Sequence, residues 1–294
     1  MSQLQDLYRD HFGMCGRPFS GLADSGVFYW GQTQVRAHAA LEYGMVSGAA
    51  FIVLTGETGS GKTSLLLSLA DAAADDQRMV FVAGLRRGGG SVLPWILHAL
   101  GQPVTGDEGD TVLHGRVQDI LIAEYAAGRR VALILDEAHN LSAEALDELR
   151  VLSNINTAQD LLVQIVLCGQ PALRDRLRAP EMSDLGQRVA SWGHLDALEP
   201  AAMQAYVGTR LAAAQGPEDL FDDDALAAVH AATGGLPRAI NQLCELALVY
   251  AMTGGCDRID ADAIGQVLSD GLYQVPLPAP DPAPRPGRLR LAVG

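Results

Sequence analysis

Residues 50–70 have the sequence AFIVLTGETGSGKTSLLLSLA, and this stretch determines the fold class of the chain. Its centre, Gly56 to Thr63, matches the phosphate-binding pattern G-x-x-x-x-G-K-S/T. The apolar run Ala50–Thr55 predicts a strand before this loop, and Ser64–Ala70 predicts a helix after it. Because the pattern is specific only between a strand and a helix, these flanks favour a nucleotide-binding loop over a glycine-rich turn that binds nothing.

The loop predicts which groups hold the nucleotide. Backbone N–H groups and the positive end of the following helix surround a polyphosphate in such a loop. Lys62 is expected to bind the β- and γ-phosphates, and Thr63 to offer its hydroxyl to Mg²⁺, which prefers hard oxygen ligands. We therefore predict ATP and Mg²⁺ as cofactors. The residues expected to bind them in this loop are Gly56, Glu57, Thr58, Gly59, Ser60, Gly61, Lys62, Thr63 and Ser64.

An acidic pair follows a second apolar run. Val131–Leu135 ends at Asp136 and Glu137. Continuous apolar runs are typical of central parallel strands, and ligands bind at the carboxyl ends of such strands. We predict that Asp136 holds Mg²⁺, commonly through water, and that Glu137 accepts a proton from the attacking water or orients it. The alternative is that the pair caps the next helix.

Three more strands are expected around these two. Met79–Leu85 and Leu161–Gly169 are apolar, and a short segment after Arg188 completes five. Gln170 follows the fourth strand beside the acidic pair, where contact with the γ-phosphate or water and an ordinary turn are equally open. From the local sequence alone, Arg188 is expected to be a solvated surface arginine. Arg238 is expected to lie in the first turn of a helix, without a functional role.

The flanking segments differ from this α/β region. Residues 1–31 contain Pro18 and five glycines, so we expect an irregular arm whose aromatic side chains either touch the adenine or pack on the core. From Pro200 only helices are expected. The predicted organisation is an N-terminal arm at 1–31, a P-loop core at 32–199, a helical lid at 200–272 and a proline-rich tail at 273–294.

The core is expected to begin with a helix. Residues 32–47 predict this helix, with its apolar face at Val35, Ala39, Tyr43 and Val46.

Composition narrows the class of protein further. With 294 residues the chain is long enough for about two domains, and its formal net charge of −14 disfavours a surface that coats nucleic acid. Four scattered cysteines without a C-x-x-C pair predict neither a zinc site nor a disulfide framework. The chain has no apolar run near the 18 residues or more of a membrane helix. We therefore expect a cytoplasmic protein without a membrane span.

Several motifs together resemble one family. They are the F-G-x-x-x-x-P-F start at Phe12, GETGSGKT, LDEAHNLSAEALDELRVLSN, QIVLCGQPAL, QRV and GGLPRAINQLC. The set resembles the ExeA, or general secretion pathway protein A, family of AAA+ ATPases over about Phe12 to Leu268. The resemblance implies a three-layer P-loop NTPase (AAA+) core with a parallel five-stranded sheet, followed by a small all-helical lid. It covers the ATPase module alone, without the family's membrane helix and peptidoglycan-binding domain.

The resemblance also implies an activity. It implies Mg-dependent ATP hydrolysis by a dimer or ring, with Arg188 matching a candidate arginine finger and Arg238 the sensor 2 arginine of the lid. The leading hypothesis is an ATPase that couples nucleotide-dependent assembly to a membrane-associated secretion, pilus or polysaccharide-export machine. One alternative is a DNA-directed helper ATPase of a transposition-type system, which the acidity disfavours. The other is a slow nucleotide-gated binding switch. The catalytic residues expected are Glu137, Arg188 and Gln170.

Overall fold

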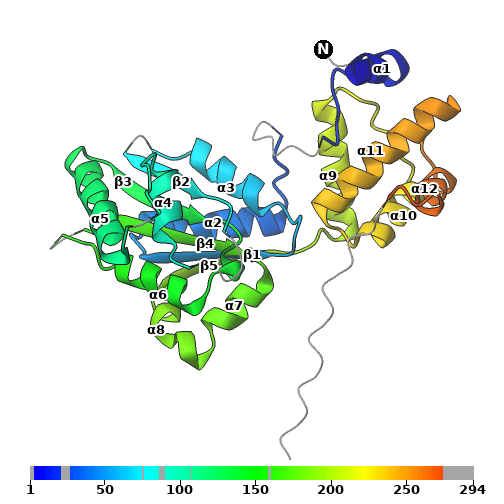
Figure 1. Cartoon of the computed structure of the whole chain (residues 1–294). Coiled ribbons are helices and arrows are strands. Elements are labelled where there is room, and N and C mark those ends of the chain that lie inside the picture. Colours follow the sequence, from blue (N-terminus) through cyan, green and yellow to red (C-terminus); the bar gives the residue numbers. More distant parts are fainter. Residues whose placement is uncertain are drawn as a thin grey trace, which may run out of the picture.

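The structure is a computed structural model that describes residues 3–20, 27–74, 76–85, 90–106, 108–157 and 160–273. Its core is a parallel five-stranded sheet with strand order β2-β3-β4-β1-β5 (Figure 1), so the predicted sheet is confirmed. The strands are β1 Phe51–Gly56, β2 Gln77–Val82, β3 Arg130–Leu135, β4 Val163–Gly169 and β5 Val189–Leu195. Every residue of β1 and β4 is buried, as continuous apolar runs predict for central strands.

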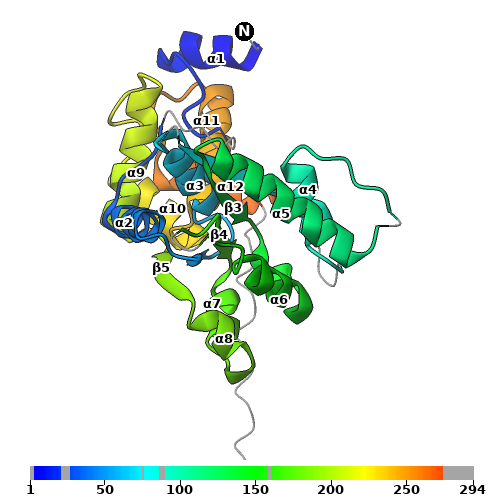
Figure 2. The ribbon, with the colours of Figure 1, turned by 90° about the vertical axis from the view of Figure 1, so that its left-hand side faces the viewer.

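Helices cover both faces of this sheet, and Figure 2 shows α2 and α5 on opposite sides of it. Successive residues of a strand point to opposite faces, so Phe51 and Val53 pack on one layer while Ile52 and Leu54 pack on the other. The first layer contains α4 Leu93–Ala99, α5 Asp110–Ala126, α6 Ala143–Leu152, α7 Pro171–Leu177 and α8 Ser183–Gly186. The second contains α2 Gln32–Val46 and α3 Lys62–Asp71. Two 3₁₀ turns are η1 Ala138–Asn140 and η2 Pro180–Met182.

The helical lid follows β5 and lies beside the sheet (Figure 1). Its helices are α9 Pro200–Ala213, α10 Asp223–Thr233, α11 Pro237–Gly254 and α12 Ala261–Ser269. Asp222 and Asp260 accept hydrogen bonds from Ala225 N–H and Ala263 N–H, which caps α10 and α12. A separate apolar core joins the four helices, so the predicted all-helical lid is confirmed. The boundaries predicted for the arm, core, lid and tail stay predictions.

The N-terminal arm is not irregular throughout, because α1 Gln3–Phe12 is a helix. Tyr8 and Phe12 are four residues apart and therefore share one helix face, and both are buried in the core of the lid together with Phe19. The glycines and the proline of the arm all follow this helix, so they do not oppose it. The spacing of Tyr8 and Phe12 is the helical signal in residues 3–12. The tail from residue 274 lies outside the described residues.

The predicted apolar face of α2 is wrong. Val35 and Val46 are 50% and 87% exposed, and the buried face contains Ala37, Leu41 and Gly44 instead. The reason is close packing: a Cβ at Gly44 would lie 2.6 Å from Ile52 Cγ1 of β1. Small residues let this helix approach the sheet, and an apolar count alone cannot detect that.

Helix α7 was not predicted either. From the sequence we expect only a turn after the fourth strand, but Pro171 is favoured in the first turn of a helix, where the missing N–H of proline costs no hydrogen bond. Helix α7 therefore begins directly after Gln170. The sheet edge and this helix together set the position of Gln170.

Candidate functional site

The phosphate-binding pattern folds into a loop between β1 and α3. Gly59 and Gly61 have φ of +85° and +96°, a backbone conformation that favours glycine. Lys62 is the first residue of α3, and its Nζ donates hydrogen bonds to the carbonyl oxygens of Gly56 and Glu57, each 2.9 Å away. The ammonium group is therefore held inside the curve of the loop, at the positive end of the helix, where a polyphosphate would lie.

The acidic pair lies next to this loop, because β3 and β1 end at the same edge of the sheet. Thr63 Oγ1 donates a hydrogen bond to Asp136 Oδ2 over 3.0 Å. A hydroxyl and a carboxylate side by side fit Mg²⁺, which binds through one or two carboxylates, waters and phosphates. The described residues include no group of three or more His, Cys, Asp or Glu side chains able to hold a metal, and this mode of binding needs none.

A buried thiol, Cys168, interacts with the acidic pair. Cys168, near the end of β4, is buried, and burial raises the pKa of its thiol well above the ordinary value, with the Asp136 carboxylate adding to the effect. A thiol held in its neutral form is a poor nucleophile. We therefore assign Cys168 to the core rather than to the chemistry of the site.

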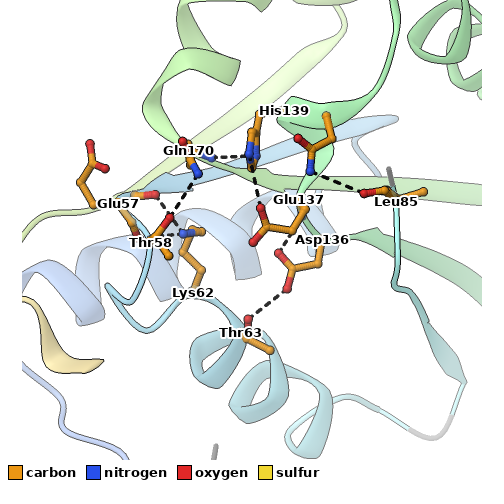
Figure 3. A network of polar contacts seen from close by, with 11 residues as sticks. Glu57, Thr58, Lys62, Thr63, Leu85, Asp136, Glu137, His139 and Gln170 are labelled. Atoms are coloured by element: carbon orange, nitrogen blue, oxygen red, sulfur yellow. Dashed lines mark hydrogen bonds and ion pairs between the residues drawn. The ribbon is translucent and has the colours of Figure 1, made fainter. Parts of the chain in front are cut away.

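Figure 3 shows a chain of polar contacts from the acidic pair to the P-loop. His139 Nε2 lies 3.4 Å from Glu137 Oε2, and His139 Nδ1 lies 3.4 Å from the backbone N of Gln170. The side-chain amide of Gln170 in turn donates a hydrogen bond to Thr58 Oγ1, 3.1 Å away. The geometry thus joins Gln170 to the P-loop. Sequence reasoning gave His139 no role, although it is the last letter of the D-E-A-H run.

A cavity of about 760 Å³ opens between the sheet edge and the lid. Phe19, Phe28 and Tyr29 of the N-terminal arm line it, and Phe19 is also buried in the lid core together with Phe12, so the arm contributes to both. Of the predicted site residues, Gly56, Glu57, Gln170 and Arg188 are not part of the lining. The predicted residues that line the cavity are Thr58, Gly59, Ser60, Gly61, Lys62, Thr63, Ser64, Asp136, Glu137 and Arg238.

The lid reaches the P-loop through Arg238. The backbone N–H of Arg238 donates a hydrogen bond to the Gly59 carbonyl oxygen over 3.1 Å. A Cβ on Gly59 would lie 2.7 Å from Arg238 Cβ, so only glycine permits this approach. The first turn of α11 therefore lies directly against the phosphate-binding loop.

This contact gives a testable prediction. Gly59→Ala should destabilise the fold by about 1–2 kcal/mol through its left-handed backbone and by more through the clash with Arg238. Gly48→Ala is the matched control, because Gly48 has φ of +68° and nothing within 4 Å of a Cβ. Thermal unfolding of both variants measures the difference. Equal losses in the two variants would show that the contact with the lid does not constrain residue 59.

Arg188 lies at the other edge of the sheet. It precedes β5, whose first residue, Val189, pairs with Phe51 at the start of β1, whereas the P-loop follows the end of β1. The guanidinium donates hydrogen bonds to Asn154 Oδ1 at 2.6 Å and Ser153 Oγ at 3.1 Å, just after α6. The structure thus separates Arg188 from the cavity of its own chain.

Comparison with known proteins agrees with this geometry. Residues 45–177 match the model of a family described as AAA domain. The chain has the AAA+ P-loop fold. General secretion pathway protein A of Aeromonas hydrophila is 34% identical over 253 residues, which are 86% of this chain and 46% of that protein. The predicted resemblance to its family is confirmed, and the chain spans just under half of this relative's length.

Solved structures of other proteins share the fold at low identity. Cdc6p from Pyrobaculum aerophilum aligns with a TM-score of 0.69 at 17% identity, covering 88% of this chain and 71% of that one. The Drosophila ORC bound to DNA aligns with a TM-score of 0.66 at 16% identity, covering 93% and 67%. These likenesses support the fold of core and lid alone. In the described part of the chain, no helix is both long and apolar enough to cross a membrane.

Proposed function

We propose that this chain binds Mg·ATP in the cavity between the sheet edge and the lid and hydrolyses it to ADP and phosphate. One observation carries the proposal. The groups required for phosphate binding, metal binding and proton transfer converge: Lys62 lies in the P-loop, Thr63 contacts Asp136 at 3.0 Å, and Glu137 lines the same cavity. A loop that served only as a turn would need no acidic pair beside it.

Each group has a separate task in this proposal. Lys62 and the loop N–H groups bind the β- and γ-phosphates. Thr63 and Asp136 hold Mg²⁺, which when bound neutralises charge on the phosphate oxygens. Glu137 accepts the proton of the attacking water. Arg238 binds the phosphates from the lid, next to Gly59, so that nucleotide contacts both parts of the chain.

We further propose that hydrolysis is shared between copies of the chain in a dimer or ring. The position of Arg188, away from the cavity of its own chain, supports this, because a contribution to hydrolysis then has to come from a neighbour. The expected work is to couple nucleotide-dependent assembly to a membrane-associated secretion, pilus or polysaccharide-export machine on the cytoplasmic side. The resemblance to general secretion pathway protein A supports that assignment for the shared region.

A first test concerns nucleotide binding. Lys62→Ala should weaken ATP binding about 10²-fold or more, because it removes charge-assisted hydrogen bonds to phosphate that are each worth about 1.5–3 kcal/mol. Titration calorimetry with Mg·ATP measures the affinity, and circular dichroism shows that the variant is folded. Unchanged affinity in a folded variant would remove the P-loop assignment.

The rate of turnover distinguishes a motor from a slow switch. Phosphate release by the wild-type chain, measured with increasing protein concentration, should rise per subunit as the dimer or ring forms. Binding without measurable turnover would instead favour a nucleotide-gated switch. Affinity capture with a variant that binds ATP but does not hydrolyse it then identifies the partner.

A further inference from the structure

The backbone at Glu137 is unusual. Its φ of 55° and ψ of 31° lie in the left-handed region, which residues other than glycine seldom adopt. Its N–H donates a hydrogen bond to Asp136 Oδ1 at 2.8 Å, and the turn η1 begins with the next residue. Such a conformation costs of order 1–3 kcal/mol and persists only where surrounding contacts enforce it. Those contacts decide where the carboxylate points.

The imidazole of His139 contacts the carboxylate of Glu137. The imidazole side chain is 8% exposed, and its Nε2 lies 3.4 Å from Glu137 Oε2. The backbone N–H of Gln170 donates to Nδ1, so Nδ1 accepts and Nε2 carries the proton in the neutral ring. The N–H of His139 therefore faces the carboxylate. In the same way, histidine and carboxylate partners fix each other's orientation around metal sites.

The end of β4 holds this ring in place. A Cβ at Gly169 would lie 3.2 Å from the backbone N of His139 and 3.3 Å from Nδ1, which is tighter than ordinary van der Waals contact, so the strand end packs closely against the turn. The next residue, Gln170, binds the ring through its backbone and Thr58 of the P-loop through its side chain. The orientation of His139 is thus set by the strand that also contacts the P-loop.

We propose that His139 is a positioning residue for Glu137: it holds the carboxylate toward the cavity in the orientation that accepts a proton from water. The inference rests on the proposed function, since it assigns the base to Glu137. It adds a residue that binds neither nucleotide nor metal. Gln170 acts in this arrangement mainly through its backbone, which selects the tautomer of His139, and its side chain links that arrangement to Thr58.

The experiment compares variants that keep or lose the N–H. His139→Phe keeps a ring without nitrogen, and His139→Gln keeps an amide N–H within reach of Glu137. We expect His139→Phe to lower kcat about 10- to 100-fold with KM and ATP affinity nearly unchanged, and His139→Gln to recover part of the rate. His98→Phe is the control, because His98 is exposed on α4 and does not line the cavity.

A double variant separates positioning from a structural role. If His139 acts through Glu137, adding His139→Phe to Glu137→Gln should lower the rate no further, because the base is already lost. An equal fall in both backgrounds would overturn the proposal, and so would a rate for His139→Phe at or above that of the wild type. Should His139→Phe fail to fold, His139→Met, which is also without an N–H, carries the same expectation.

The proposed function has its own readout in this set. Wild-type turnover equal to that of Glu137→Gln would refute Glu137 as the base, and the inference about His139 with it. Turnover that depends on Glu137 but not on His139 would overturn the positioning role alone. The two failures are therefore distinguishable from the same rate measurements.

Discussion

Arg188→Ala is expected to leave ATP binding intact and to lower the hydrolysis rate about 10³- to 10⁵-fold, the range found for arginine fingers. During hydrolysis, negative charge spreads over the departing phosphoryl group, and Lys62 with Mg²⁺ neutralises only part of it. An arginine supplied by a neighbouring copy would neutralise more. This expectation rests on the proposed shared site.

The position of Arg188 decides how its effect can arise. Strand β5 runs from Val189 to Leu195, which pairs with Gly56 at the start of the P-loop. Six strand steps of about 3.3 Å separate the two ends, or roughly 20 Å. The Arg188 side chain is also held at Asn154, on the edge of the sheet far from the loop. A role of Arg188 in hydrolysis therefore requires a second copy of the chain.

Mixing experiments test this requirement directly. Arg188→Ala subunits have an intact P-loop, and Lys62→Ala subunits have an intact Arg188. A mixed interface pairs the two intact parts, so the mixture should regain activity that neither variant has alone. Native mass spectrometry would show whether mixed oligomers form. If they form and the mixture remains inactive, or if the wild-type monomer is fully active, Arg188 is an ordinary surface arginine.

Glu137→Gln is expected to bind Mg·ATP as tightly as the wild type and to hydrolyse it about 10²- to 10⁴-fold more slowly. The amide keeps the size of the side chain but does not accept a proton from water. Because Asp136 and Thr63 are untouched, the proposed metal site keeps both of its protein groups.

Two measurements check this prediction. Titration calorimetry should give an unchanged affinity, and single-turnover hydrolysis should give the reduced rate independently of product release. Asp147→Asn is a suitable control, because Asp147 is an exposed carboxylate on α6 that pairs with Arg150 outside the cavity. Turnover of Glu137→Gln at the wild-type rate would assign the proton acceptor to another residue.

Much of the fold was predictable because its signals are local. The P-loop letters and the apolar strands depend on neighbours in the chain, and the structure has the five expected strands, followed by helices from Pro200 on. Helix α7 was missed although its proline signal is local, whereas the buried face of α2 and the place of the arm depend on packing between distant segments. The side of α2 that contains Gly44 faces the sheet, because Gly44 lies against Ile52. Tyr8 and Phe12 of α1 are buried in the core of the lid, which begins more than 180 residues later in the chain.

The site divides in the same way. The sequence by itself determined the identities of Lys62, Thr63, Asp136 and Glu137, because each occurs in a short motif whose chemistry follows from its residue types. Only the tertiary structure placed Arg238 on Gly59, His139 between Glu137 and Gln170, and Arg188 at the far edge of the sheet. The physical reason is that these contacts form where the parallel strands and the lid bring together segments that are far apart in the chain. The spacing of residues along the sequence does not show which of these segments meet.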